Sequence, residues 1–181
     1  MSERETSVTT RSLQGLVLLL ATAATLRAVD WWPRTTLNAG RVHELPTIDA
    51  VERAAGRHLA LPSWFPSSLP WPPSRVQVLG TVPSAVALEL GAGGAPLVVL
   101  AQSVREPVPL PPSFFPPALE LETRSIPWRG GEATLTRLRG EDGSTWVELA
   151  WVQDGQAFAF RTRGSLEQLL ELAATVHREG P

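Results

Sequence analysis

Residues 132–162 of the chain read EATLTRLRGEDGSTWVELAWVQDGQAFAFRT. Apolar and polar side chains alternate along it with the period of two that is typical of half-buried β-strands. The alternation stops at Asp142-Gly143 and again at Asp154-Gly155, dipeptides that favour two-residue hairpin turns. The stretch therefore predicts three consecutive antiparallel strands.

The two turns also predict which side chains share a face. The second turn places Trp151 opposite Phe158, and the first places Leu138 opposite Val147. We therefore expect one buried face, made of Thr134, Thr136, Leu138, Val147, Leu149, Trp151, Phe158, Phe160 and Thr162.

On the same registers, the other face of these strands gathers basic side chains around one tryptophan. We interpret it as a candidate binding surface for an anionic lipid headgroup, a cell-wall polymer or an acidic partner. The alternative is a solvated face whose charge is balanced by Glu132 and Glu148. The candidate residues are Arg137, Arg139, Trp146, Arg161 and Arg163.

Two helices are predicted outside the strands. Thr47 and Gly56 have the residue types of an N-cap and a C-terminal stop, so they bound a short helix. Ser165 caps a last helix, with Gln168 at the capping-box position. The apolar stripe of the last helix is expected to pack on the aromatic face of the sheet and consists of Leu166, Leu169, Leu170, Ala173 and Val176.

Residues 61–73 and 107–117 are rich in proline, which excludes helix interiors and central strands. The first of these loops offers Trp64, Phe65 and Trp71. These rings form either a docking loop for a partner or a rigid loop that tucks them under the core. The predicted fold class is α+β: an antiparallel sheet of about six strands, with a short N-terminal helix and a C-terminal helix packed on one face, preceded by a hydrophobic helix.

The N-terminal part of the chain reads as a polar tail (1–12), a membrane anchor or signal segment (13–32) and a linker (33–46), before an extracytoplasmic domain (47–181). Residues 13–29 are nearly all apolar but span only about 25 Å as a helix, just short of a bilayer core. An uncleaved single-pass anchor is the first interpretation. A signal peptide cleaved near Ala21-Thr22-Ala23 and a buried helix stay open as alternatives.

Several chemistries are excluded or disfavoured. The chain has no cysteine, so it has no disulfide and no thiolate site. His43, His58 and His177 are scattered without metal-ligand spacing, and no nucleophile elbow or phosphate-binding glycine motif occurs. The net charge of −2 disfavours nucleic acid. We therefore predict a non-enzyme without cofactors.

Three short segments carry a resemblance to other proteins. They are Leu61-Pro62-x-x-Phe65-Pro66, then Trp151-x-x-x-Gly155-x-x-Phe158-x-Phe160, and after it Leu166-x-x-Leu169-Leu170-x-x-Ala173. Over residues 48–178 the chain resembles a bacterial domain of unknown function. That domain occurs at the C-termini of LolA-like lipoproteins and in anti-sigma-factor-type ectodomains. The resemblance implies an exported, non-catalytic module, and it implies no functional residues.

Together these features predict a membrane-tethered extracytoplasmic module that binds or senses something at the cell envelope. Its expected partners are the membrane, through residues 13–32, and an envelope protein or an anionic lipid. Two alternatives stay open: a structural or assembly subunit of a membrane protein complex, and an unrecognised envelope hydrolase.

Overall fold

A computed structural model describes residues 40–92 and 95–178 of the chain. The predicted tail and hydrophobic segment, residues 1–32, lie outside these residues. No helix in the described ranges is long and apolar enough to cross a membrane.

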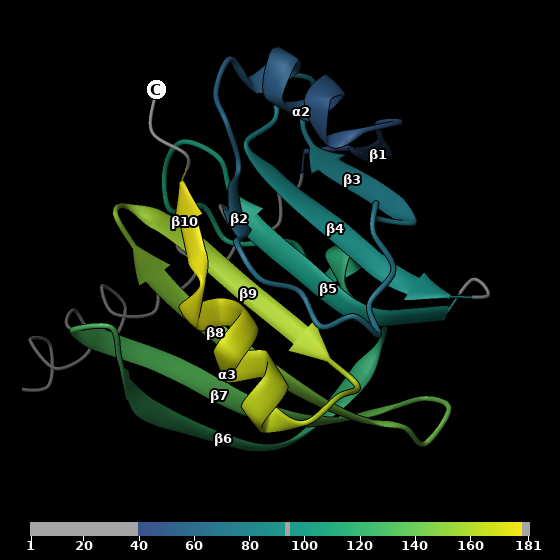
Figure 1. Cartoon of the computed structure of the whole chain (residues 1–181), viewed down its shortest axis with the longest axis vertical. Coiled ribbons are helices and arrows are strands. Elements are labelled where there is room, and N and C mark those ends of the chain that lie inside the picture. The colour runs from purple at the N-terminus through teal and green to yellow at the C-terminus, as the bar shows by residue number, and fades with distance from the viewer. Residues whose placement is uncertain (1–39, 93–94, 179–181) are drawn as a thin grey trace, which may run out of the picture. The chain divides into compact units, whose positions relative to one another are not determined.

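The main element is an eight-stranded antiparallel sheet rather than one of about six strands. Two meanders lie side by side in it, because β9 pairs with β5 (Figure 1). In spatial order the strands are β1 (Val42–Glu44), β3 (Arg75–Leu79), β4 (Ala85–Ala92), β5 (Ala95–Ser103), β9 (Gln156–Thr162), β8 (Thr145–Gln153), β7 (Gly131–Gly140) and β6 (Ala118–Trp128). The predicted α+β class is confirmed for the described residues.

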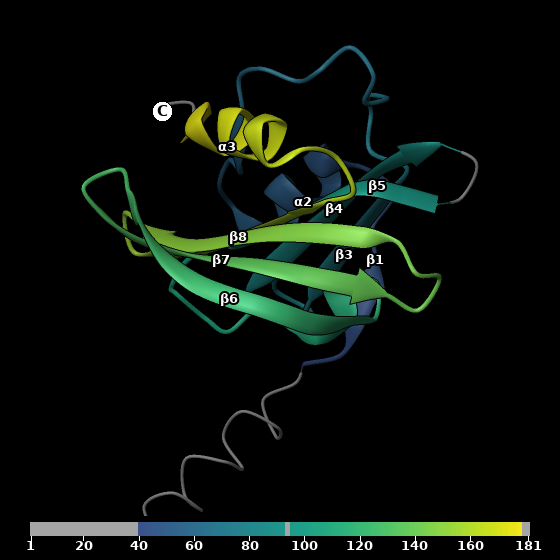
Figure 2. The same ribbon diagram turned by 90° about the horizontal axis from the view of Figure 1, so that it is seen from below.

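The helices α2 (Ile48–Ala55) and α3 (Leu166–Ala174) lie on the same side of the sheet, which we call the helix face (Figure 2). A second, two-stranded sheet joins β2 (Ala60–Pro62) to β10 (Val176–Arg178). The predicted caps are confirmed. The Thr47 side chain accepts a hydrogen bond from the Ala50 amide, and the Ser165 side chain accepts one from the Gln168 amide.

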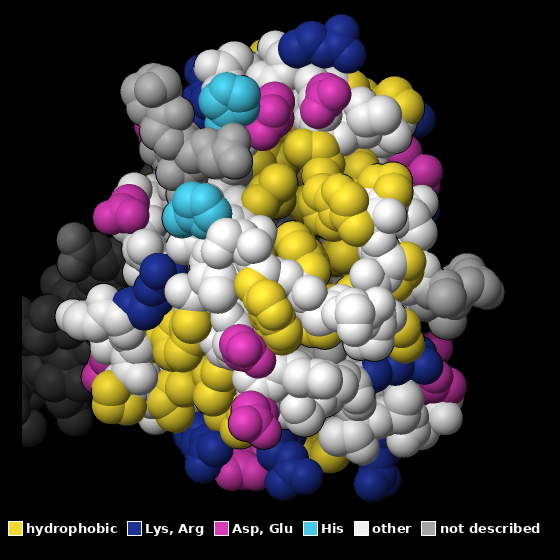
Figure 3. Space-filling model, viewed as in Figure 1, with side chains coloured by type: hydrophobic (Ala, Val, Ile, Leu, Met, Phe, Trp, Pro, Cys, Tyr) yellow, Lys and Arg dark blue, Asp and Glu magenta, His cyan; other side chains and the backbone are white. Residues whose placement is uncertain are grey.

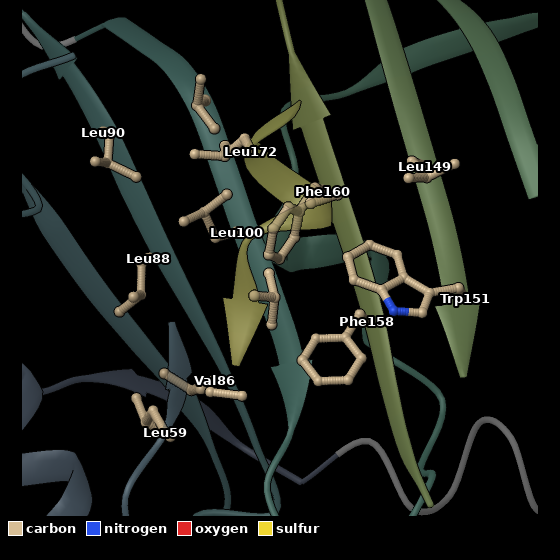
Figure 4. Packing of buried hydrophobic residues seen from close by; sticks show 14 of the residues in the cluster. Leu59, Val86, Leu88, Leu90, Leu100, Leu149, Trp151, Phe158, Phe160 and Leu172 are labelled. Carbon is tan, nitrogen blue, oxygen red and sulfur yellow. The ribbon is translucent and has the colours of Figure 1, made fainter. Parts of the chain in front are cut away.

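The core of the helix face is aromatic where the sequence predicts it. Trp151 stacks on Phe158 with ring centroids 4.9 Å apart, and Phe160 meets Trp151 edge-on at 5.0 Å. Leu172 of α3 belongs to the same buried cluster (Figure 4). The predicted packing of the last helix on this face is therefore confirmed.

The opposite face of the sheet, the loop face, is covered by the second proline-rich loop. This connection leaves β5, includes the single turn η1 (Pro112–Phe114), and reaches β6 at the far edge of the sheet. Phe114 is buried in a small cluster with Val99 and Ala101 of β5. The loop thus gives the loop face an apolar cover of its own.

The predicted linker 33–46 is wrong over its last residues, because they contain β1. Val42 pairs with Leu79 of β3, and Arg75 of β3 binds Glu44 of β1. A three-residue strand is too short for a pattern of alternation to reveal it, and it depends on these contacts with β3.

Near the same edge of the sheet, Glu89 is expected to make the stability of the fold depend on pH. Burial raises the pKa of Glu89 on β4, an effect that Arg75 opposes. A carboxyl group whose pKa is higher in the folded state than in the unfolded state binds its proton more tightly in the folded state. The free energy of unfolding therefore falls as the pH rises from the unfolded-state pKa through the folded-state pKa. We therefore expect Glu89→Gln to gain stability relative to the wild type over this rise.

Urea unfolding at a series of pH values between about 4 and 8 measures this difference. Glu171→Gln, which removes an exposed carboxylate from α3, is the control. A difference between Glu89→Gln and the wild type that stays constant with pH would contradict the assignment.

Candidate functional site

The predicted arginine surface is divided between the two faces of the sheet. Arg137 on β7 lies opposite Val147 on β8 rather than opposite Glu148, a register one residue away from the prediction. Arg137 and Arg139 therefore belong to the helix face. The three other predicted members lie on the loop face: Trp146, Arg161 and Arg163. The prediction of a single surface is wrong.

The turn between β7 and β8 causes this shift. The Gly143 amide donates to the Gly140 carbonyl at 2.9 Å, and the Gly140 amide donates to the Ser144 carbonyl at 2.8 Å. Gly143 has a φ of 79°, and the Asp142 side chain accepts from the Ser144 amide. These are the bonds of a three-residue turn with a glycine bulge. The additional loop residue moves every later side chain of β8 to the other face.

Arg161 is occupied by contacts within the protein. Its guanidinium lies 2.6 Å from the Glu148 carboxylate and donates to the Pro116 carbonyl at 2.8 Å. It also lies over the Phe115 ring, 4.5 Å from the centroid. Arg161 thus fastens the proline-rich loop to the sheet and offers little to a ligand.

Arg163 and Trp146 keep the neighbourhood that the sequence predicts. The guanidinium carbon lies 4.7 Å from the centre of the Trp146 ring, and the same group pairs with Asp142 at 2.8 Å. Trp146 is only 1% exposed, so its ring is covered. This cluster stabilises the β7–β8 turn.

The predicted docking loop, in contrast, presents aromatic surface. Trp64 is 36% exposed and Trp71 is 49% exposed. Phe65 packs against the buried core cluster, and its ring centroid lies 4.9 Å from that of Trp71 at a tilt of 44°. Phe65 packs on the core, as the interpretation of a rigid loop predicts, while both tryptophans remain exposed to solvent.

Trp71 and Phe65 form one wall of a groove of about 580 Å³. Hydrophobic side chains gather on this face around a hollow, with histidine and acidic side chains at its border (Figure 3). We call this the apolar groove. Its lining residues are Ile48, Asp49, Glu52, His58, Leu59, Leu61, Pro62, Ser63, Phe65, Trp71 and His177.

The small sheet positions the middle of the apolar groove. Leu61 on β2 lies directly opposite His177 on β10, so the two side chains point to the same side. The buried Gln102 side chain fixes β2 from below, since it accepts from the Ala60 amide at 3.0 Å and donates to the Ala60 carbonyl at 2.8 Å. The groove is therefore attached to the main sheet through β5.

One border of the groove is acidic. Asp49 and Glu52 lie one helical turn apart on α2, and both line the groove. The Glu52 carboxylate accepts from the Leu59 amide at 2.9 Å and lies 3.0 Å from Nδ1 of His58. These contacts hold Glu52 in place, while Asp49 is exposed.

The lining of the groove determines which chemical groups it can contact. Within residues 40–92 and 95–178, no group of three or more histidine and acidic side chains is arranged to hold a metal ion. The lining offers apolar and aromatic area, two carboxylates and two imidazoles. Such a site can desolvate an apolar group and attract a neighbouring positive charge.

Sequence reasoning found the aromatic wall but missed the other walls. The proline and tryptophan content of residues 61–73 made Phe65 and Trp71 candidates for a docking loop, beside the alternative of a rigid loop under the core. Glu52, His58 and His177 carried no motif. Glu52 and His58 meet just after α2, and His177 reaches the groove because β10 pairs with β2. The acidic pair on α2 was the one available signal, and it is indistinguishable from an ordinary solvated helix face.

No family model, curated protein or solved structure matched this chain.

Proposed function

We propose that this chain is a membrane-tethered, extracytoplasmic, non-catalytic binding module, whose apolar groove takes an apolar side chain of an envelope protein. The observation that carries the proposal is the exposed Trp71 beside Phe65 in a groove of about 580 Å³. Exposed aromatic side chains in a concave apolar site are typical anchors for partners.

The acidic border defines the chemistry of the partner. Asp49 and Glu52 place negative charge beside the apolar lining, so lysine or arginine next to the inserted side chain would be attracted. A peptide in which one large apolar residue is flanked by basic residues is therefore the favoured ligand class. The tether is the predicted segment 13–32.

The test uses the full chain in uncharged detergent and a labelled peptide with one leucine between lysines. Fluorescence anisotropy measures its dissociation constant. Trp71→Ala should weaken binding about tenfold or more, since truncating an aromatic anchor typically costs about 2 kcal/mol.

Two controls accompany this measurement. Val152→Ala removes a side chain that is 62% exposed on the loop face and should leave binding unchanged. A peptide with glutamates in place of the lysines should bind more weakly than the cationic one. Equal affinity of the wild type and Trp71→Ala for the cationic peptide would reject the groove as its site.

A further inference from the structure

A second cavity, of about 410 Å³, lies on the helix face beside the first residue of α3. We call it the basic cavity. Its apolar part is formed by Leu135, Val147 and Leu166. Its polar part is formed by Arg124 and Arg137, together with Glu122 and Thr145.

The pairing of β6 with β7 brings the guanidinium groups together. Arg124 on β6 lies opposite Leu135, which places it diagonally across from Arg137 on β7. Side chains in this relation are within reach when they are as long as arginine. Arg139 follows Arg137 by two residues and therefore adds a third guanidinium on the same face.

Little negative charge balances these arginines. Glu122 lies 3.7 Å from Arg137, and their side chains are 55% and 62% exposed, so this ion pair is weak. Over the described parts of the chain, no carboxylate lies within ion-pair distance of Arg124 or Arg139. The cavity therefore has an excess of positive charge and unused hydrogen-bond donors.

We infer that the basic cavity binds a phosphate group, supplied either by a soluble phosphate ester or by a phospholipid headgroup. Guanidinium forks match the geometry of phosphate oxygens and can bind them with two parallel hydrogen bonds. Leu166 begins α3, so the positive end of the helix dipole lies at the same cavity and adds to the attraction. This site is separate from the apolar groove and does not depend on the function proposed for it.

The test titrates the full chain in uncharged detergent micelles, in a phosphate-free buffer of low ionic strength. The probes are inorganic phosphate, glycerol phosphate, and micelles that contain short-chain phosphatidylglycerol. Isothermal titration calorimetry measures the affinity for each probe. The test variant is Arg124→Gln/Arg137→Gln. The matched control is Arg41→Gln/Arg53→Gln, which removes the same charge from exposed arginines elsewhere.

We expect the test variant to bind about tenfold more weakly or worse, because it loses two charged donors, and the control to change less than about twofold. Binding of the soluble probes supports a phosphate ester as ligand. Binding of the lipid-containing micelles alone supports a headgroup. The inference is overturned if the wild type binds no probe, or if both double variants weaken binding equally. Trp71→Ala should leave phosphate binding unchanged, which separates this result from that of the groove.

Discussion

Replacing Trp151 by alanine is expected to lower the free energy of unfolding by about 3–5 kcal/mol, the range typical of large aromatic side chains in a core. Trp151 is 5% exposed and touches aromatic rings from three other positions: Trp128, Phe158 and Phe160. Its removal opens a cavity under α3 that these rings cannot fill. Urea unfolding followed by circular dichroism measures the loss.

Two substitutions make this result interpretable. Val152→Ala changes the next residue, which points to the loop face and is exposed, and should shift stability by less than about 0.5 kcal/mol. Trp151→Phe keeps an aromatic ring and removes an indole N–H that has no hydrogen-bond partner within the described residues. It should cost clearly less than alanine. A near-neutral Trp151→Ala would show that this face is not the core.

The hairpins show how far local sequence determines the fold. At Asp154-Gly155 both residues have positive φ, 50° and 70°, as a two-residue type I′ turn requires. The predicted pairing of Trp151 with Phe158 is confirmed. At Asp142-Gly143 only the glycine has positive φ. Asp-Gly suits both turn types, so the dipeptide alone could not decide between them.

The edge of the sheet shows what a local pattern leaves open. Leu119, Leu121 and Thr123 alternate with charged residues, which predicts a strand at the start of β6, but almost all of β6 is exposed in the structure. It lies at the sheet edge, where charged residues and proline are tolerated. Its partner β7 and the type I′ turn at Arg129-Gly130 hold it there. The pairing of β5 with β9 likewise joins separate meanders and leaves no local signal.

The same limit applies to the two candidate sites. Composition left two interpretations of residues 61–73 open, a docking loop and a rigid loop tucked under the core; in the structure Trp64 and Trp71 are exposed, while Phe65 packs on the core. The arginine surface failed because a one-residue register error exchanges the faces of a strand. That error placed Arg137 on the face of Arg161, from which the structure separates it. The proximity of Arg137 to Arg124 depends on the pairing of β6 with β7. Long-range pairing thus decides which charges meet.

The second large loss of stability is expected when Gln102 is replaced, because its side chain hydrogen-bonds to the backbone of β2. Its amide group makes two hydrogen bonds to the backbone of Ala60, and both residues are buried. Leucine has a similar volume but no polar atoms, so Gln102→Leu leaves a buried N–H and a buried carbonyl unpaired. Each such group costs about 1–3 kcal/mol, and we expect a total loss of about 2–4 kcal/mol.

This substitution also connects the core to the apolar groove, because β2 carries Leu61 into the groove. Gln102→Leu should therefore weaken binding of the cationic peptide as well as lower the free energy of unfolding. Fluorescence anisotropy without urea, where the variant is still folded, measures the binding. Glu171→Leu, which places leucine at an exposed polar position of α3, is the control and should change neither quantity. Unchanged stability would show that water or β10 satisfies the Ala60 backbone. Lost stability with unchanged peptide affinity would show that β10 alone holds Leu61 in position.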